Sequence, residues 1–205
     1  MIHRLFSSGA IALCVCLLLS SPSLQATELA PSDIVEGFQA KLIQVMKEAK
    51  NLSVRERFNR LSPSVEKAFH MHLMNQIATG SYWKEATATE RNQLIDAFRR
   101  MTVTSLATLF DDYSGEVFEL VKESPGPQKT RIVRTKLRKS DKSTIDIAYV
   151  MLRFKEGWKI IDVILDNGIS ELKVRQSEYR MVLKKEGVPG LISLLNNTAD
   201  ELISG

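Results

Sequence analysis

The spacing of apolar residues changes from helical to alternating near the middle of the chain. From 117 to 166, apolar residues recur with a period of two, which predicts four strands at 117–122, 130–138, 144–154 and 158–166. The links between them are short, so we expect neighbouring strands to pair antiparallel in a meander. The stretches on both sides of this region have helical spacing.

Two of the predicted strands are apolar on both faces. In the strand at 144–154, Ile147 and Tyr149 point to one face, and Val150 and Leu152 point to the other. The strand at 158–166 alternates in the same way. A sheet that is apolar on both sides is either sandwiched between layers or lines a cavity.

Helices are predicted before and after the sheet. Asp33, Ser53 and Thr87 are each followed three residues later by a glutamate, a capping pattern that predicts three helix starts. Pro63 is suited to a first helical position, so we expect the helix from Ser53 to end and a new one to begin there. The end of the chain has helical spacing again, with Gly187 as a break.

The order of helices, sheet and helices is typical of a single α+β domain. The chain shows no internal repeat, no low-complexity segment and no linker long enough to divide it. We therefore expect residues 27–205 to form one domain. Its core would be a curved antiparallel sheet of about four strands, a meander packed by helices from both ends of the chain.

The start of the chain has the pattern of a secretory signal peptide. His3 and Arg4 form a positive head, and residues 10–19 are an unbroken apolar run. Small residues follow, and we expect cleavage after Ala26, which makes residues 1–26 the signal. The apolar run is shorter than the roughly 20 residues that a membrane-spanning helix needs. The exported protein is thus expected to act in solution.

Both cysteines, Cys14 and Cys16, lie inside the predicted signal, so the exported domain has none. This excludes disulfides, thiolate metal ligands and cysteine nucleophiles from the domain. The densest basic stretch, 129–142, predicts either a solvated strand face with a turn or a footprint for an anionic surface. Nucleic acid is not expected as a partner, because no recognised binding motif accompanies this stretch.

The exported sequence contains no recognisable catalytic or metal-binding motif. His70 and His72 are two residues apart, and on a helix they point in different directions, so they would not share a metal ion. Asp162, on the last predicted strand, could act as a general base in a cavity. The favoured expectation is that it pairs with a basic residue of a neighbouring strand, such as Arg153. We expect no metal, no cofactor and no enzymatic activity.

Aromatic and methionine side chains, among them Phe98, Met101 and Trp158, are spread over the predicted helices and sheet. Such a distribution is most often an ordinary core. The alternative is a pocket for a flexible apolar ligand, because methionine adapts to irregular apolar shapes.

An ordered set of short segments resembles the MlaC-type family, also called the toluene-tolerance ABC-transporter auxiliary component. The segments include GSYW at 80–83, DYSGE at 112–116, GWKIIDV at 157–163 and GVPGLI at 187–192. No single segment is specific, but their order is. Details such as Arg57-Phe58 resemble the hopanoid-biosynthesis-associated branch of the family, often labelled HpnM.

This resemblance implies a monomeric carrier in a Gram-negative periplasm. It would bind the acyl tails of a phospholipid, or of a hopanoid-type lipid, in an apolar cavity between sheet and helices. It would shuttle them between an outer-membrane lipoprotein complex and an inner-membrane ABC transporter complex. The alternative is a periplasmic adaptor or chaperone-like module without a lipid pocket. Our candidates for lipid-binding residues are Tyr82, Trp83, Phe98, Met101, Val150, Leu152, Trp158 and Ile160.

Overall fold

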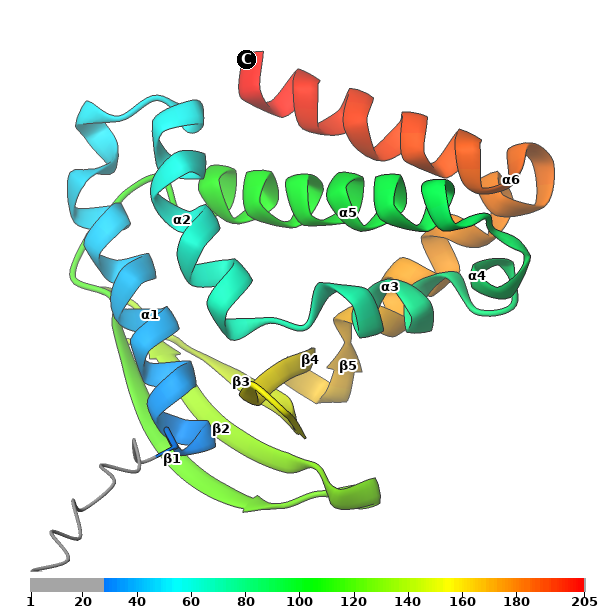
Figure 1. Ribbon diagram of the computed structural model, residues 1–205. Helices are drawn as coiled ribbons and strands as arrows, with labels where there is room; N and C mark the ends of the chain where they lie inside the picture. Colours follow the sequence, from blue (N-terminus) through cyan, green and yellow to red (C-terminus); the bar gives the residue numbers. More distant parts are fainter. Residues whose placement is uncertain (1–27, 205) are drawn as a thin grey trace, which may run out of the picture.

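A layer of helices covers one face of a curved antiparallel sheet (Figure 1). This computed structural model describes residues 28–204. The predicted signal peptide and its two cysteines lie outside the described residues. No helix within the described part of the chain is long and apolar enough to cross a membrane.

The sheet is a meander whose five strands pair in chain order, each antiparallel to the next. The strands are β1 (Val117–Pro125), β2 (Arg131–Arg138), β3 (Thr144–Phe154), β4 (Gly157–Leu165) and β5 (Ile169–Ser170). The register shifts once between β1 and β2 and once between β3 and β4. Such bulges bend a strand and increase its twist. The predicted α+β class and antiparallel meander are confirmed, and β5 is an addition.

Six α-helices lie within residues 28–204: α1 (Pro31–Glu48), α2 (Val54–Ala68), α3 (Met71–Thr79), α4 (Tyr82–Glu85), α5 (Ala88–Leu109) and α6 (Glu171–Ser204). Ser53 and Thr87 each form the predicted capping box with the glutamate three residues later. Gly187 divides α6 into two segments with φ at 66°, a left-handed conformation that glycine adopts without strain. The predicted break at Gly187 is thus confirmed.

The predicted helix boundary at Pro63 is wrong, because α2 continues through this proline. Leu61 and Val65 lie on either side of it, and both side chains are fully buried in the core. A proline inside a helix removes one backbone hydrogen bond. An uninterrupted helix keeps both neighbours in the core, and their burial offsets that loss.

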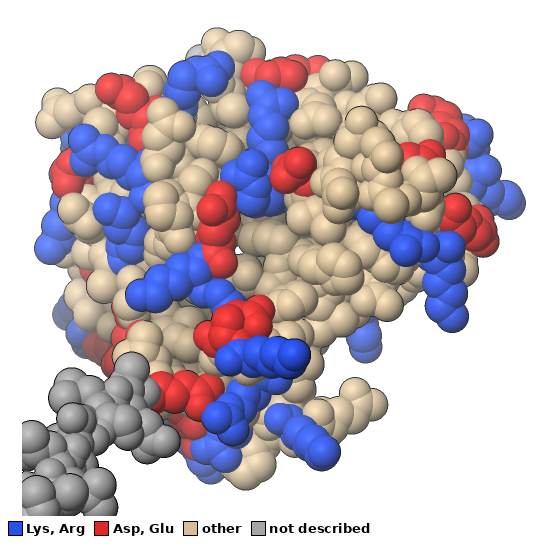
Figure 2. Space-filling view, in the orientation of Figure 1, with Lys and Arg blue, Asp and Glu red and all other residues tan. Residues whose placement is uncertain are grey.

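The basic stretch 129–142 forms β2 and the turns at its two ends. Three of its cations pair with carboxylates of neighbouring strands: Arg131 with Glu123, Lys136 with Asp146, and Arg138 with Glu119. Figure 2 shows positive and negative side chains interspersed over the face that it draws. This arrangement agrees with a solvated strand face, the first of the two interpretations of this stretch.

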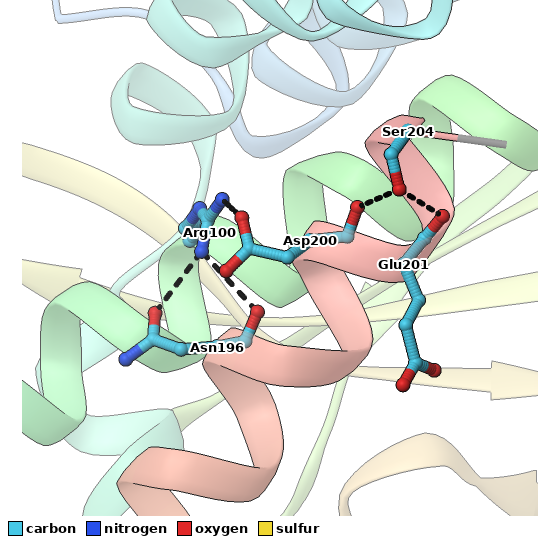
Figure 3. Close-up of polar contacts among 5 residues, drawn as sticks. All are labelled: Arg100, Asn196, Asp200, Glu201 and Ser204. Carbon is cyan, nitrogen blue, oxygen red and sulfur yellow. Dashed lines mark hydrogen bonds and ion pairs between the residues drawn. The ribbon is translucent and has the colours of Figure 1, made fainter.

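The second segment of α6 lies along α5 (Figure 1). Arg100 of α5 donates hydrogen bonds to the backbone oxygen of Asn196 at 3.2 Å and to its Oδ1 at 3.4 Å, and pairs with the carboxylate of Asp200 (Figure 3). One arginine therefore contacts two successive turns of α6, which holds the two helices side by side.

Candidate functional site

An apolar cavity of about 250 Å³ lies between the helical layer and the inner face of the sheet. Its walls come from every layer of the fold: α1, α3, α5, the start of α6, and three strands. The lining consists of Phe38, Leu42, Phe69, Met74, Phe98, Thr102, Ser105, Leu106, Leu109, Phe110, Phe118, Ile147, Tyr149, Val163, Leu165, Glu171, Leu172 and Arg175.

The sheet wall of the cavity follows from strand register. Ile147 of β3 lies opposite Leu165 of β4, and Tyr149 lies opposite Val163. Directly opposed residues in an antiparallel pair point to the same face, so all four side chains reach the cavity. Phe118 adds a ring from β1.

The opposite wall is one face of α5. Phe98, Thr102, Ser105 and Leu109 are spaced by four, three and four residues, which places them along a single line of the helix. Phe98 is almost completely buried, whereas Leu109 is 73% exposed. The cavity therefore opens to solvent beside the C-terminal end of α5.

Two phenylalanines close the inner end of the cavity. The rings of Phe38 and Phe69 meet edge to face, with centroids 5.0 Å apart and planes at 82°. The backbone also fixes Phe69, because it forms a short parallel bridge with Ile160 of β4. The backbone amide of His70 donates to the carbonyl of Ile160 at 2.9 Å, which joins the helical layer to the sheet.

A buried polar cluster ties α1 to the sheet beneath the cavity. The Gln39 side-chain amide donates to Thr135 Oγ1 at 2.9 Å and to the Tyr149 hydroxyl at 3.1 Å. Burial raises the pKa of Tyr149 to about 12, so the hydroxyl stays protonated and uncharged at neutral pH. The cavity thus meets the apolar ring of Tyr149, while the hydroxyl group is satisfied by Gln39.

Polar lining residues come mainly from α5 and α6. Thr102 and Ser105 lie on α5, and Glu171 and Arg175 lie in the first turns of α6. All four side chains are only partly buried. Arg175 also forms an ion pair with Glu178 at 3.1 Å. A ligand in the cavity would therefore meet hydroxyl and charged groups on the side where α5 faces α6.

The size and lining of the cavity suit hydrocarbon. Its volume exceeds the ~150 Å³ of an apolar cavity that binds benzene, and lies just below the ~300–1,000 Å³ of pockets that bind drug-sized ligands. No cluster of metal-binding side chains occurs among the described residues. The cavity therefore admits a short stretch of an apolar chain, and a larger ligand requires it to widen.

The structure places one of the eight candidate residues, Phe98, in the cavity lining. Ile160 is fully buried in the core, and Trp83 is buried against His72. The remaining candidates do not line this cavity. Tyr82, Met101 and Trp158 pack partly buried against the core, and Val150 and Leu152 alternate with the inner residues of β3 and so lie on the outer face of the sheet.

A bulge in β4 explains why the alternating pattern of the sequence did not predict which β4 side chains line the cavity. Val150 pairs with Asp162, but the adjacent Met151 pairs with Ile160, so Ile161 is an extra residue. One extra residue moves the following side chains to the other face. Ile160 therefore shares the inner face with Val163, whereas simple alternation placed the two on opposite faces.

The predicted pairing of Asp162 with Arg153 is wrong. Asp162 instead accepts hydrogen bonds from the Ser170 hydroxyl at 2.6 Å and from the backbone amide of Leu172 at 3.2 Å. Its carboxylate thus occupies the positive N-terminal end of α6. Arg153 pairs with Glu28. These contacts give Asp162 a structural role in joining β4 to α6.

His70 also has a structural role. Its Nδ1 accepts a hydrogen bond from the backbone amide of Leu73 at 3.1 Å, which caps α3. The imidazole stacks on Phe154, with ring centroids 3.8 Å apart. Burial lowers the pKa of His70, which favours the neutral form that can accept this hydrogen bond.

Two comparisons connect this fold to known proteins. A family model described as MlaC protein matches residues 36–197. The phospholipid-binding protein from Ralstonia solanacearum, solved in complex with a phospholipid, has the same fold, with a TM-score of 0.74 over 85% of this chain and 99% of that chain. The two sequences are 17% identical, so this likeness concerns the fold. Because the family model spans most of the sequence, the protein belongs to the MlaC family.

Proposed function

We propose that this protein is a periplasmic carrier that holds the acyl tails of a phospholipid in the cavity. The observation that carries the proposal is a cavity walled by five phenylalanines and by aliphatic side chains, with charged groups only where α6 begins. Membership of the MlaC family supports it. So does the shared fold with a protein that was solved with a phospholipid bound.

Burial of the tails supplies the binding energy. Each methylene group moved out of water contributes about 0.8 kcal/mol, so a long tail binds too tightly to leave at a useful rate without help. Release therefore requires a partner that opens the cavity or competes for the tails. The proposed partners are an outer-membrane lipoprotein complex and an inner-membrane ABC transporter complex, and membership of the MlaC family supports them.

The cavity widens most easily between α5 and the sheet. No side-chain hydrogen bond or ion pair joins α5 to a strand among residues 28–204, and the two face each other across a mainly apolar cavity. Acyl tails that enter between α5 and the sheet would contact apolar side chains on both sides, so no hydrogen bond would have to break. By contrast, α1 is held to the sheet by Gln39, so separating it would break two buried hydrogen bonds.

A substitution that fills the cavity tests the proposal. Ser105 lines the cavity, and Ser105→Trp places an indole where the tails would lie. Gln93→Trp is the matched control, because Gln93 is exposed on the same helix and does not line the cavity. Each protein is purified without detergent from cells that express the full chain. Native mass spectrometry and organic extraction then measure the bound lipid.

We expect the wild type and Gln93→Trp to carry lipid in stoichiometric amounts, and Ser105→Trp to carry much less. The extracted mass also identifies the lipid as a phospholipid or a hopanoid. Equal lipid in all three proteins would show that the cavity is not the binding site. A folded wild type that carries no lipid would contradict the carrier function and favour an adaptor.

A further inference from the structure

The first segment of α6 carries a row of exposed cations on its outward side. Lys173, Arg180 and Lys184 are exposed and, with spacings of seven and four residues, lie along one line of the helix. Met181 and Lys185 lie beside this line. We call these five residues the α6 face. In Figure 1 this segment lies at the edge of the molecule opposite α1.

The cations of the α6 face lie free of ion pairs in the part of the chain that the structure describes. None of its four cations takes part in an ion pair among the described residues. The nearby acid Glu178 is paired with Arg175, at 3.1 Å. These cations are therefore available to an anionic partner.

Met181 is the most exposed apolar residue of this segment. Its side chain is 68% exposed, whereas Leu172, Tyr179 and Leu183 on the inner side of the same helix are at most 4% exposed. Its position, two and a half turns after Leu172, directs it away from the core. The apolar face of this helix is buried in the core, so its outward side offers a membrane surface mainly cations, with one methionine beside them.

The α6 face adjoins the cavity. Leu172 and Arg175, in the same segment, are part of the cavity lining. A partner bound to the α6 face would therefore lie close to the side of the cavity where α5 faces α6. A membrane that binds these cations would therefore lie near the cavity.

We propose that the α6 face docks the protein on an anionic lipid bilayer. The centre of a protein interface is depleted in lysine, whereas this face presents four cations and a single exposed methionine. A fluid array of lipid phosphates requires only separate cations and one side chain that can enter the headgroup region. Docking goes beyond the proposed carrier function, since a lipid can be carried without it.

Vesicle binding tests this proposal. The probes are vesicles of phosphatidylcholine alone and vesicles of equal parts phosphatidylcholine and phosphatidylglycerol, and cosedimentation measures the binding constant. The test variant is the triple substitution Lys173→Gln, Arg180→Gln, Lys184→Gln. The matched control, called the sheet variant, removes three exposed cations from the turns at the two ends of β2, Lys129→Gln, Lys139→Gln, Lys142→Gln, which likewise form no ion pair among the described residues. Bound lipid per protein is measured for each variant in parallel.

The wild type and the sheet variant are expected to bind the anionic vesicles and to lose this binding at high salt. Each surface cation contributes about fivefold to the binding constant, so the α6 variant is expected to bind about 100-fold more weakly. Its bound lipid should be unchanged, which separates docking from carriage. Adding Met181→Ser to the α6 variant should weaken its binding to anionic vesicles further.

Three results would overturn the proposal. Equal binding of the wild type to neutral and anionic vesicles would show that the cations do not direct docking. A loss of binding in the sheet variant rather than the α6 variant would place the docking surface at the turns beside β2. Absence of binding to either vesicle would leave a protein with an acidic surface as the partner of the α6 face.

Discussion

At the scale of single residues, Arg57 shows how a buried charge is stabilised without a carboxylate. The residue is 8% exposed, and its guanidinium donates to the backbone oxygens of Ala107 at 2.7 Å, Leu52 at 2.6 Å and Ala49 at 3.3 Å. These carbonyls belong to the C-terminal ends of α5 and of the α1 region, where the helix dipole is negative. One side chain thereby ties two helix ends together.

Replacing Arg57 should therefore destabilise the fold. Arg57→Met keeps a similar shape but leaves the three carbonyl groups without their charged donor. We expect the free energy of unfolding to fall by about 2–3 kcal/mol. Urea denaturation measures this change. Arg55→Met on the exposed side of the same helix is the control and should change stability by less than about 0.5 kcal/mol. Equal effects of the two substitutions would refute the role of Arg57.

At the scale of elements, the sequence predicts helices and strands well, and fails where tertiary packing decides. The strand at 144–154 and the helix starts at Ser53 and Thr87 were predictable, because alternation and capping are local properties. The continuation of α2 through Pro63 was not, because it depends on burial of the neighbouring turns. Nor was the bulge at Ile161, since only pairing with β3 reveals an extra residue.

The contact between α5 and α6 predicts a pH dependence. The hydrogen bond from Arg100 lowers the pKa of Asp200. A carboxylate with a lower pKa in the folded state stabilises the fold above its unfolded pKa, and this contribution is lost as the pH falls through the folded value. Asp200→Asn should therefore reduce the loss of stability between about pH 5 and about pH 2.

Urea midpoints measured at several pH values would test this prediction. Asp96→Asn on the exposed side of α5 is a suitable control, because Asp96 forms no ion pair among the described residues. The control should follow the wild type. If Asp200→Asn follows it too, the pair with Arg100 does not contribute to acid stability.

At the scale of the whole molecule, the cavity depends on several elements that are distant in sequence. Phe98 was named from the sequence, but Phe38, Phe118 and Leu172 join it only because α1, β1 and α6 are brought together by the fold. Local patterns show that such residues are apolar. They do not show which apolar residues border an empty space, because packing decides this.

Bound lipid should stabilise the folded molecule as a whole. A ligand that binds only the folded state adds stability, about 2.7 kcal/mol when its concentration is 100 times the dissociation constant. We therefore expect removal of lipid to lower the melting temperature by roughly 5–10 °C, as measured by calorimetry. The Ser105→Trp protein, which should carry little lipid, is expected to melt at the same temperature before and after this treatment.

The positions of the two tryptophans have a practical consequence. Neither Trp83 nor Trp158 lines the cavity, and Trp83 lies edge to face with His72 at 5.0 Å. Their fluorescence should therefore follow unfolding, while remaining insensitive to an acyl chain in the cavity. An environment-sensitive probe on a lipid analogue would give a separate optical signal. Folding and loading can thus be followed independently in the same sample.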